Sequence, residues 1–464
     1  MSYAQSARRV ALDVIMAVRE SDAYANLLLP VYVERAKLST ADAGLATELT
    51  YGTLRMQGYY DAVIEQAAVR AVSKIDPPVL DVLRLATHQL LSMRVPSHAA
   101  VDESVRLAKT IGSRSAVGFV NAVLRAITKH EPEVWRERVI GAARSGEEAL
   151  ALAYSHPLWV TRAFRQVLVA EGREAELEAL LAADNVPARV SVAALPGFAD
   201  AAQIDATIAE YSPVGGTLRA GDPSKNAAVA SARARVQDEG SQLAALALSR
   251  ARPIVAGELW LDMCAGPGGK AALLAAEALM GGAQLTANEL ISARAKLVRN
   301  ALAVFDAPPE VWEKDGVEIG NEHPEEFDRI LLDAPCTGLG ALRRRPEARW
   351  RKQPSDVAQL GALQTALLHS ALNALKPGGL LAYVTCSPHA AETKAIVGSV
   401  LRKVPGVSKM DTPAVLREIS VGELDMPEAS HVQLWPHRHG TDAMFIQLLV
   451  KADSSIGSRY VSSY

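Results

Sequence analysis

The 464-residue chain has few cysteines and lacks any long apolar run. Its three cysteines, an odd number in a long chain, argue against a disulfide framework and fit a reducing compartment. No stretch approaches the roughly 18 apolar residues that a membrane-spanning helix needs, and the N-terminus has no signal-peptide core. We therefore expect a cytoplasmic protein with reduced thiols and no membrane partner.

The chain also lacks a strong excess of charge of either sign. Its formal net charge is -3 and its pI is about 6.4, so composition gives no general signal for a polyanionic partner. A nucleic-acid surface would need local clustering of arginine and lysine. The length exceeds that of one ordinary domain and predicts two to four domains.

The N-terminal part is rich in apolar residues at helical spacing. Val10, Val14 and Val18 are one such set, and breakers such as 76–78 separate the expected helices. We predict a compact all-α bundle over 1–150. Residues 151–235 are expected to form a linker helix and a small α+β subdomain, because 188–193 alternate like a strand.

From 236 to 452 the pattern changes to alternating strands and helices. This order favours a doubly wound parallel sheet, in an α/β Rossmann-like domain. The expected strands are 258–262, 283–288, 310–314, 328–333 and 379–385, with 433–435 and 445–450 closing the sheet as an antiparallel hairpin. The Ser-rich tail, 453–464, is expected to be flexible.

A glycine-rich turn follows the first of these strands and predicts a nucleotide-type ligand. Gly266, Gly268 and Gly269 let main-chain N–H groups approach a ligand at the start of a helix. Glu289 ends the next strand, where a carboxylate can accept hydrogen bonds from ribose hydroxyls, and Asp315 ends the third, within reach of an adenine amino group. The three signals together favour adenosine binding over a mere tight turn.

Three adenosine-containing ligands compete for this turn. A P-loop requires a Ser or Thr after its lysine, whereas Lys270 is followed by Ala271. The G-x-G-x-x-G pattern of dinucleotide-binding folds is not matched either. S-adenosylmethionine fits the turn better than both.

Two cysteines lie just beyond apolar strands, so their thiols are expected to face one crevice. Cys336 follows 330–332 and Cys386 follows 380–384, and ligands of open α/β sheets collect at the carboxyl ends of strands. Methyl transfer to cytosine C5 requires a thiolate to add first to C6, and a second group can then assist product release. Asp333 could contact the N3/N4 edge of a flipped base.

The alternative for each cysteine is a small buried hydrophobic residue. Two observations favour the functional interpretation. Cys336 and Cys386 occur as a pair, and residues 337–340 form a loop rather than a continuing core strand. Cys264 lies in the glycine-rich turn and is interpreted as packing. No C-x-x-C spacing indicates a zinc site, and we expect no metal.

A basic run follows the Cys336 loop and is expected to contact RNA. Phosphate contacts and stacking on a tryptophan would position a single-stranded or flipped nucleotide. The residues proposed for this role are Arg343, Arg344, Arg345, Arg349 and Trp350.

At these motifs the chain resembles the Sun/Fmu/RsmB group of the Nol–Nop–Sun family of RNA cytosine-5 methyltransferases. The resemblance is carried by 237–242, 264–270, 333–338 and 385–387, and residues 7–127 resemble the NusB-like RNA-binding domain fused to that group. The family's Gly-Thr-Asp-Gly-Phe-Phe pattern occurs at 440–445 with Ala443 and Met444 as replacements, which leaves details of the target pocket open.

The resemblance implies a role for each site residue. Cys386 would be the nucleophile, Cys336 would help to release product, and Lys270 would support catalysis. S-adenosylmethionine would be bound by Cys264, Ala265, Gly266, Pro267, Gly268, Gly269, Lys270, Glu289, Asp315 and Asp333. The implied substrate is 16S rRNA, and one chain is expected to hold a complete site as a monomer.

Two further hypotheses remain from the residues alone. The same chemistry could act on tRNA, because thiol and cofactor residues do not distinguish classes of RNA. A non-catalytic RNA-binding or antitermination factor could retain the methyltransferase fold as a scaffold.

Overall fold

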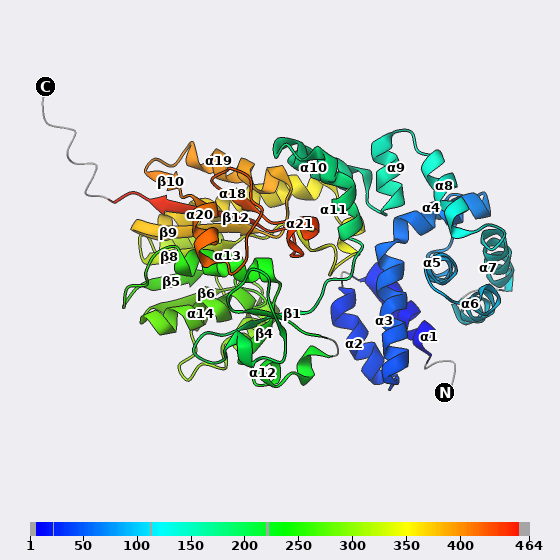
Figure 1. Cartoon of the computed structure of the whole chain (residues 1–464), viewed down its shortest axis with the longest axis horizontal. Coiled ribbons are helices and arrows are strands. Elements are labelled where there is room, and N and C mark those ends of the chain that lie inside the picture. Colours follow the sequence, from blue (N-terminus) through cyan, green and yellow to red (C-terminus); the bar gives the residue numbers. More distant parts are fainter. Residues whose placement is uncertain (1–5, 22, 112–113, 220–221, 454–464) are drawn as a thin grey trace, which may run out of the picture. The chain divides into compact units, whose positions relative to one another are not determined.

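The computed structural model describes residues 6–21, 23–111, 114–219 and 222–453. The chain forms two compact units (Figure 1). Unit 1 comprises Met1–Pro187 and Leu342–Lys352, and unit 2 comprises Ala188–Ala341 and Gln353–Tyr464. The flexible tail predicted from 453 onward lies, apart from Asp453, outside the described residues.

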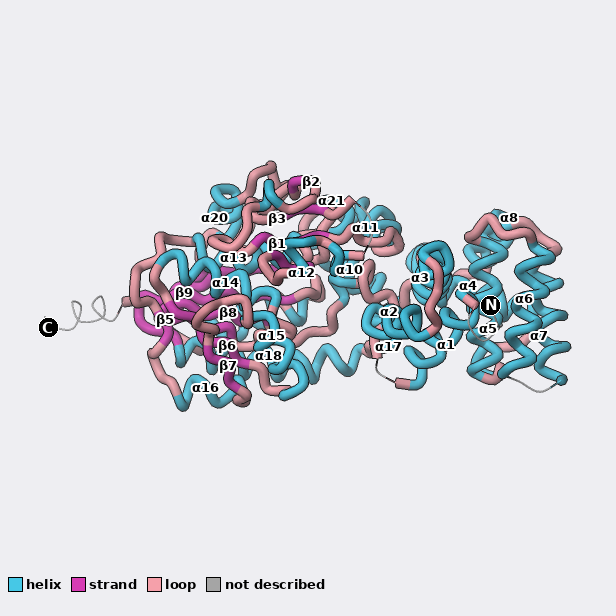
Figure 2. Tube along the Cα trace, turned by 90° about the horizontal axis from the view of Figure 1, so that it is seen from below, coloured by secondary structure: helices cyan, strands magenta, loops and turns pink. Residues whose placement is uncertain are grey.

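Unit 1 is helical throughout its described residues (Figure 2), which confirms the predicted all-α bundle. Its α-helices are α1 (Ala7–Glu20), α2 (Ala25–Arg35), α3 (Thr40–Arg55), α4 (Gln57–Ala68), α5 (Pro77–Leu91), α6 (Ser97–Ile111), α7 (Arg114–Ile127), α8 (Pro132–Gly141), α9 (Gly146–Ala153), α10 (Leu158–Ala170), α11 (Leu177–Ala183) and α17 (Ala348–Arg351), with 3-10 turns η2 (Val72–Lys74) and η3 (Glu174–Glu176).

The helices of unit 1 begin and pack as the sequence pattern predicts. Ser6 caps α1 by accepting a hydrogen bond from the Arg9 amide at 3.2 Å, and α5 begins at a proline, which needs no amide partner there. Val10, Val14 and Val18 of α1 are buried in the core of the bundle. One apolar face of each long helix therefore builds this core.

Unit 2 contains two sheets. The small sheet has the order β2-β3-β1-β4, and the central sheet has the order β10-β12-β9-β8-β5-β6-β7, with β11 paired to β12. The strands are β1 (Ser191–Ala194), β2 (Thr207–Ile208), β3 (Gly215–Thr217), β4 (Ala234–Val236), β5 (Leu259–Asp262), β6 (Gln284–Asn288), β7 (Glu310–Trp312), β8 (Phe327–Asp333), β9 (Leu375–Thr385), β10 (Val407–Lys409), β11 (Val432–Gln433) and β12 (Phe445–Lys451).

The remaining elements of unit 2 are helices that cover the sheets or connect strands. They are α12 (Ala227–Ala230), α13 (Glu239–Arg250), α14 (Gly269–Gly281), α15 (Ser292–Leu302), α16 (Gly316–Glu322), α18 (Pro354–Ala374), α19 (Lys394–Leu401), α20 (Thr412–Ile419) and α21 (Pro436–His439), with 3-10 turns η4 (Ala201–Gln203), η5 (Pro223–Lys225), η6 (Leu339–Ala341) and η7 (Ala390–Glu392).

The central sheet has a parallel part and an antiparallel edge, as predicted. Strands β7, β6, β5, β8 and β9 are parallel neighbours, and β12 pairs antiparallel with β9, β10 and β11. The short strand β10 was not predicted, because its three residues are mostly exposed and lack an apolar pattern. The expected Rossmann-like architecture is confirmed.

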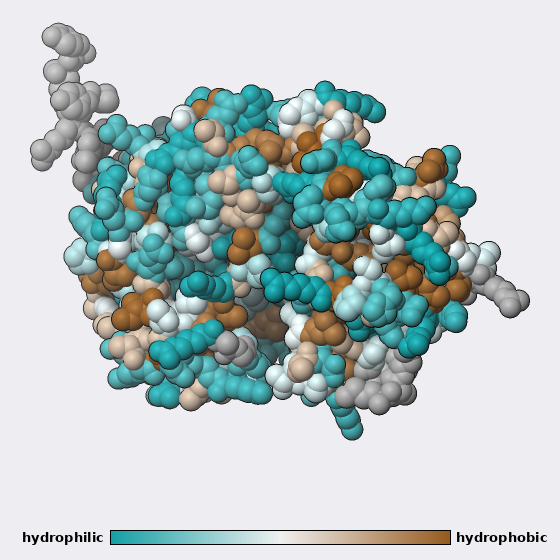
Figure 3. Space-filling model, turned by 45° about the vertical axis from the view of Figure 1, so that its right-hand side comes forward, coloured by the Kyte–Doolittle hydropathy of each residue, from teal (hydrophilic) through white to brown (hydrophobic). Residues whose placement is uncertain are grey.

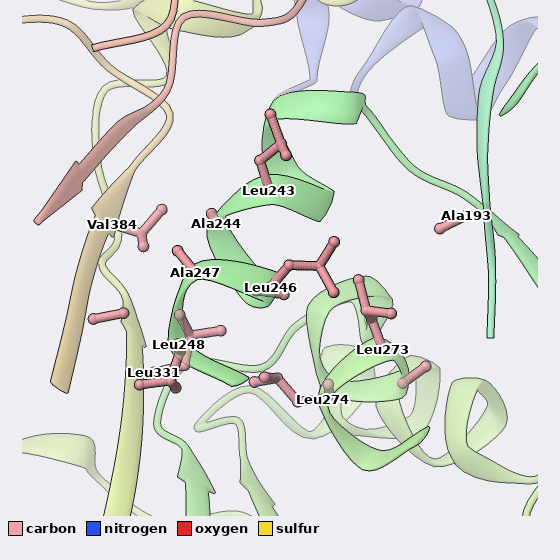
Figure 4. Close-up of a cluster of buried hydrophobic side chains, with 14 of the residues drawn as sticks. Ala193, Leu243, Ala244, Leu246, Ala247, Leu248, Leu273, Leu274, Leu331 and Val384 are labelled. Carbon is pink, nitrogen blue, oxygen red and sulfur yellow. The ribbon is translucent and has the colours of Figure 1, made fainter. Parts of the chain in front are cut away.

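The side chains of alternate residues on the central strands pack into two separate hydrophobic cores. Leu331 on β8 and Val384 on β9 belong to the core shared with α13 and α14, whereas Leu332 and Tyr383 belong to the core on the opposite face, with α18 and α19. Figure 4 shows the first of these cores, with the side chains of α13 lying between the sheet and α14. Burial on both faces explains why the strands are continuously apolar.

Strand order reverses at β5. The next strand along the chain, β6, lies on one side of β5, and β8 lies on the other. In open α/β sheets this point creates a crevice at the carboxyl ends of the strands, where ligands bind. The loops after β5, β8 and β9 therefore border the expected ligand crevice.

The predicted linker region is shared between the two units. Helix α10 belongs to unit 1, whereas strands β1 to β4 belong to unit 2, and this small sheet confirms the α+β interpretation. The predicted domain boundaries at 150 and 235 stay predictions. In the described ranges no helix is both long and apolar enough to cross a bilayer, and hydrophilic residues cover most of the face in Figure 3.

Candidate active site

The two thiols predicted to share a crevice do lie together. Strands β8 and β9 are parallel neighbours, with Asp333 beside Val384, so their carboxyl ends meet at the same edge. Cys336 follows the end of β8 by three residues and Cys386 follows β9 directly. Their Sγ atoms are 3.4 Å apart, and both side chains are partly buried. This distance allows one thiol to donate a hydrogen bond to the other.

The environment of Cys336 favours its protonated form. The hydrogen bond with Cys386 raises the pKa of Cys336 well above its ordinary value, and burial and the charge of Cys386 act in the same direction. Cys336 is therefore the donor of the pair when Cys386 is a thiolate. The two sulfur atoms are not equivalent, although the spacing of the sequence treats them alike.

A lysine links the glycine-rich turn to the thiols. Lys270, in the first turn of α14, forms an ion pair with Asp333 at 2.8 Å. Burial lowers the pKa of Lys270, but the charge of Asp333 and its hydrogen bond more than offset this, and Cys386 also contributes, so the pKa is raised overall. Lys270 thus supplies a positive charge in the surroundings of Cys386.

The glycine-rich turn lies against Glu289, which was predicted to contact the ribose. The Gly266 amide donates to Glu289 Oε2 at 3.1 Å, and the Ile291 amide donates to Glu289 Oε1 at 3.1 Å. A Cβ atom at Gly266 would lie only 2.2 Å from Glu289 Oε2, so a larger residue there would displace the Glu289 carboxylate. Arg294 completes the turn by donating to the Gly266 carbonyl at 2.8 Å.

The buried carboxylate of Asp262 is a feature of this turn that the sequence analysis did not identify. Asp262 ends β5 and is fully buried, no described side chain donates a hydrogen bond to its carboxylate, and the Cys264 amide faces it. Burial raises its pKa to about 8, and the charge of Asp333 adds to this effect. An acidic residue at the end of an otherwise apolar strand, directly before the glycine-rich turn, was the available signal.

The remaining cofactor candidates surround the same turn. Asp315 is exposed and lies three residues beyond β7, where it caps α16 by accepting a hydrogen bond from the Val317 amide at 3.0 Å. Burial raises the pKa of Cys264, which fits the packing role expected for it. Ala265 is buried beside Pro267 in the turn itself.

The C-terminal pattern contacts the Cys336 loop. Gly340 donates to the Cys386 carbonyl at 2.9 Å and accepts a hydrogen bond from the Ala443 amide at 2.8 Å. A Cβ atom at Gly340 would lie 2.0 Å from the Ala443 carbonyl oxygen. Met444, which replaces a phenylalanine of the family pattern, is buried in the core around α13.

The basic run belongs to unit 1, and its central arginine has a different role from the predicted one. Arg349 is fully buried and donates to the Ser155 carbonyl and to Asn185 Oδ1, each at 3.0 Å. Burial lowers its pKa to about 10. The expected RNA contact by Arg349 is therefore corrected to structural support within the helical unit, because a buried and hydrogen-bonded guanidinium has no surface for a phosphate.

The other residues of the run differ in exposure. Arg345 is exposed, with its guanidinium 4.8 Å from the centre of the Tyr24 ring, whereas Arg343 is buried and Arg344 partly buried. Trp350 is partly buried against α4, where a Cβ atom at Gly58 would lie 2.2 Å from its ring. Arg345 is thus the member of the predicted set that keeps an exposed guanidinium.

Two family models match the chain. The model for 16S rRNA methyltransferase RsmB/F matches residues 253–450, which include the glycine-rich turn and both thiols. The model for the NusB family matches residues 5–129 of the helical unit.

Curated relatives match over nearly the whole chain. Rv1407 of Mycobacterium tuberculosis, named as a methyltransferase, is 46% identical over 448 residues, with 96% of each chain covered. Ribosomal RNA small subunit methyltransferase B of Pseudomonas putida is 31% identical over 471 residues, covering 97% of this chain and 99% of that protein.

Solved structures share the fold. The crystal structure of PH0851 superimposes with a TM-score of 0.80 at 21% identity, covering 96% of this chain and 99% of that one. A methyltransferase homologue from Pyrococcus horikoshii gives a TM-score of 0.54 at 21% identity, covering 67% of this chain and all of that one. At these identities the likeness concerns the fold alone.

Proposed function

Because the chain belongs to the RsmB (Sun) family of S-adenosylmethionine-dependent RNA methyltransferases, we propose that it methylates C5 of a cytosine in 16S rRNA. In this proposal Cys386 forms a transient covalent bond with C6 of the base. The observation that carries the proposal is the 3.4 Å separation of the Cys336 and Cys386 sulfurs at the ends of two neighbouring strands. A single thiol would suffice for attack, and a second one beside it fits a reaction that must also release its product.

The proposed chemistry begins with the addition of the Cys386 thiolate to C6, which places the electron pair of the C5–C6 bond at C5. S-adenosylmethionine supplies the methyl group that C5 takes up and leaves as S-adenosylhomocysteine. A base then removes the C5 proton, the C5–C6 double bond re-forms, and the Cys386 thiolate departs. We assign to Cys336 the assistance of this last stage, because its sulfur touches that of Cys386.

Charged side chains support both halves of the reaction. Lys270 contributes a positive charge near Cys386, which favours the thiolate that attacks. Asp333 is partly exposed and held by Lys270, so we assign to it the contact with the N3/N4 edge of the base. A carboxylate there would accept a hydrogen bond from the N4 amino group and so orient the base for attack.

The residues around the turn fit S-adenosylmethionine. Asp262 offers a fully buried carboxylate that no described side chain pairs with, and we assign to it the ammonium group of the methionine part. Glu289 uses both oxygens for backbone amides, but each carboxylate oxygen has a second lone pair for a ribose hydroxyl. The close approach at Gly266 and the exposed Asp315 complete the set, with Asp315 assigned to the adenine amino group.

Recognition of the RNA is assigned to the helical unit and to Arg345. The NusB-family match covers most of that unit, and Arg345 has an exposed guanidinium. A ribosomal RNA substrate would place the reaction in the cytoplasm. The predicted monomeric state stays a prediction.

The test is the identity of the modified nucleoside. Purified protein is incubated with 16S rRNA transcript and radiolabelled S-adenosylmethionine, and the digested RNA is compared with nucleoside standards. The proposal expects 5-methylcytidine from the wild type and none from Cys386→Ala. Label in another nucleoside, or transfer to tRNA but not to 16S rRNA, would contradict it.

A further inference from the structure

A buried carboxylate lies beneath the two cysteine loops. Glu392 ends the turn η7 and its side chain is fully buried. Its Oε1 accepts hydrogen bonds from the Thr337 amide at 2.8 Å and from Gln364 Nε2 at 3.3 Å. Its Oε2 accepts from the hydroxyls of Thr337 at 2.5 Å and Ser387 at 2.6 Å. Four donors thus converge on one carboxylate.

These donors come from both thiol-bearing loops. Thr337 directly follows Cys336, and Ser387 directly follows Cys386. The two hydroxyls also lie 3.1 Å from each other. Gln364 of α18 donates to the Pro335 carbonyl at 2.8 Å as well, so the same network fixes the Cys336 loop on its other side.

We propose that Glu392 is a positioning residue that holds the Cys336 and Cys386 thiols at their working separation, with its negative charge on the side of Cys336. The inference rests on the proposed function, because the separation matters for a reaction that uses both sulfurs. Charge-assisted hydrogen bonds are short and directional, and here they join one residue to two loops that lie 50 positions apart in the chain.

The charge of Glu392 distinguishes the two cysteines. It acts together with Cys386, burial and Asp333 to raise the pKa of Cys336, and Tyr383 also lies close to that thiol. The positive charge of Lys270, by contrast, interacts with Cys386. Glu392 is thus one of the negative groups that favour the protonated form of Cys336.

A dithiol reagent tests the positioning without RNA or methyl donor. Phenylarsine oxide reacts with two thiols to form two As–S bonds and one water molecule, with no change of oxidation state, and it binds tightly only when both sulfurs are close. Its affinity is measured by thermal shift for the wild type, and Cys336→Ala gives the reference for a single thiol. Glu418→Ala removes an exposed carboxylate of the same unit and serves as the matched control.

Two variants of Glu392 separate the effect of its hydrogen bonds from the effect of its charge. Glu392→Ala removes all four acceptor contacts, and we expect arsenical affinity to fall at least about tenfold, toward that of Cys336→Ala. Glu392→Gln keeps an acceptor for the Thr337 amide, and the two hydroxyls can rotate to accept from its NH₂ group, so affinity should stay within about threefold. If Glu392→Ala does not fold, the double variant Thr337→Val, Ser387→Ala replaces it, with an intermediate loss expected.

A second measurement tests whether the charge of Glu392 acts on Cys336. The rate of Cys336 alkylation by iodoacetamide is followed against pH by mass spectrometry, in a Cys386→Ala background that removes the coupled thiol. Adding Glu392→Gln should lower the midpoint by at least about half a pH unit. An unchanged midpoint, or wild-type arsenical affinity in Glu392→Ala, would overturn the proposal. Neither measurement involves methyl transfer. Their outcomes therefore do not depend on whether the proposed function is correct.

Discussion

The Cys336 loop and the arginine-rich segment that follows it are adjacent in the chain, but the structure uses them differently. The loop brings Cys336 to within 3.4 Å of Cys386, as its place at a strand end predicts. The segment Leu342–Lys352 belongs to the helical unit, where Arg349 is buried. Position at the end of a parallel strand was therefore a better guide to which side chains the fold brings together than density of charge was to exposure.

The largest expected effect on methyl transfer tests the role proposed for the cysteines. Cys386→Ala removes the only group proposed to attack C6, so methyl transfer to 16S rRNA should fall at least about 10³-fold. The rate is measured with radiolabelled S-adenosylmethionine. Glu418→Ala, which removes an exposed carboxylate of the same unit, is the control and should retain the activity. Equal losses of methyl transfer in the two variants would contradict the assignment of Cys386 as the nucleophile.

The next effect tests the structural role of Arg349. Arg349→Met leaves the carbonyls of Ser155 and Asp184 and the side chain of Asn185 without their shared donor. We expect a loss of about 3–5 kcal/mol in the stability of the helical unit. Hydrogen exchange should accelerate in peptides that contain Ser155 and Asp184. Unchanged exchange, with weakened RNA binding, would restore the original prediction for Arg349.

A pH dependence tests the strand-end carboxylate Asp262. Its pKa is about 8 in the folded protein and about 3.9 when unfolded, so between these values the folded state holds a proton that the unfolded state has lost. Stability of the ligand-free protein therefore falls as pH rises toward 8, and then levels off.

Asp262→Asn removes this titration. Relative to the variant, the wild type should lose up to about 1.4 kcal/mol per pH unit between pH 6 and 8, measured by denaturant unfolding. Bound S-adenosylmethionine should reduce the slope, because an ammonium partner favours the ionised carboxylate. Parallel stability curves for the two proteins would contradict the assignment of Asp262.

The smallest effect concerns Arg345, the exposed member of the basic run. Arg345→Ala should weaken binding of 16S rRNA only a few-fold and reduce the salt dependence of log K by about 0.7–0.9, the value of one phosphate contact. Fluorescence anisotropy at several salt concentrations measures both quantities. A change in affinity with an unaltered salt slope would argue against a phosphate contact.

Much of the fold was predictable because buried strands leave a local signal. The five parallel strands and the closing hairpin occur where apolar runs predicted them, and helical spacing predicted the bundle. Strand β10 was not predictable, because pairing with β12 rather than its own residues makes it a strand. Likewise, nothing local in Leu342–Lys352 indicates that it packs against segments of unit 1 that lie 164 to 333 residues earlier.

The candidate site was predictable where one residue type at a strand end carries the chemistry. Cys336, Cys386, Asp333 and Glu289 all lie where this reasoning put them. Glu392 was missed because its importance comes from contacts with Thr337 and Ser387, which only the folded chain creates. The proposed order of the two thiols, with Cys386 as the nucleophile, came from the family resemblance and not from their positions in the chain.

The most direct test of the central claim is the site of the covalent bond to RNA. Cys336→Ala protein is incubated with S-adenosylmethionine and 16S rRNA, the RNA is digested, and the peptide that carries a nucleotide is identified by mass spectrometry. The account predicts an accumulated adduct on Cys386, because attack and methyl transfer proceed while release is slowed. An adduct on Cys264, or none with methyl transfer continuing at the wild-type rate, would contradict it.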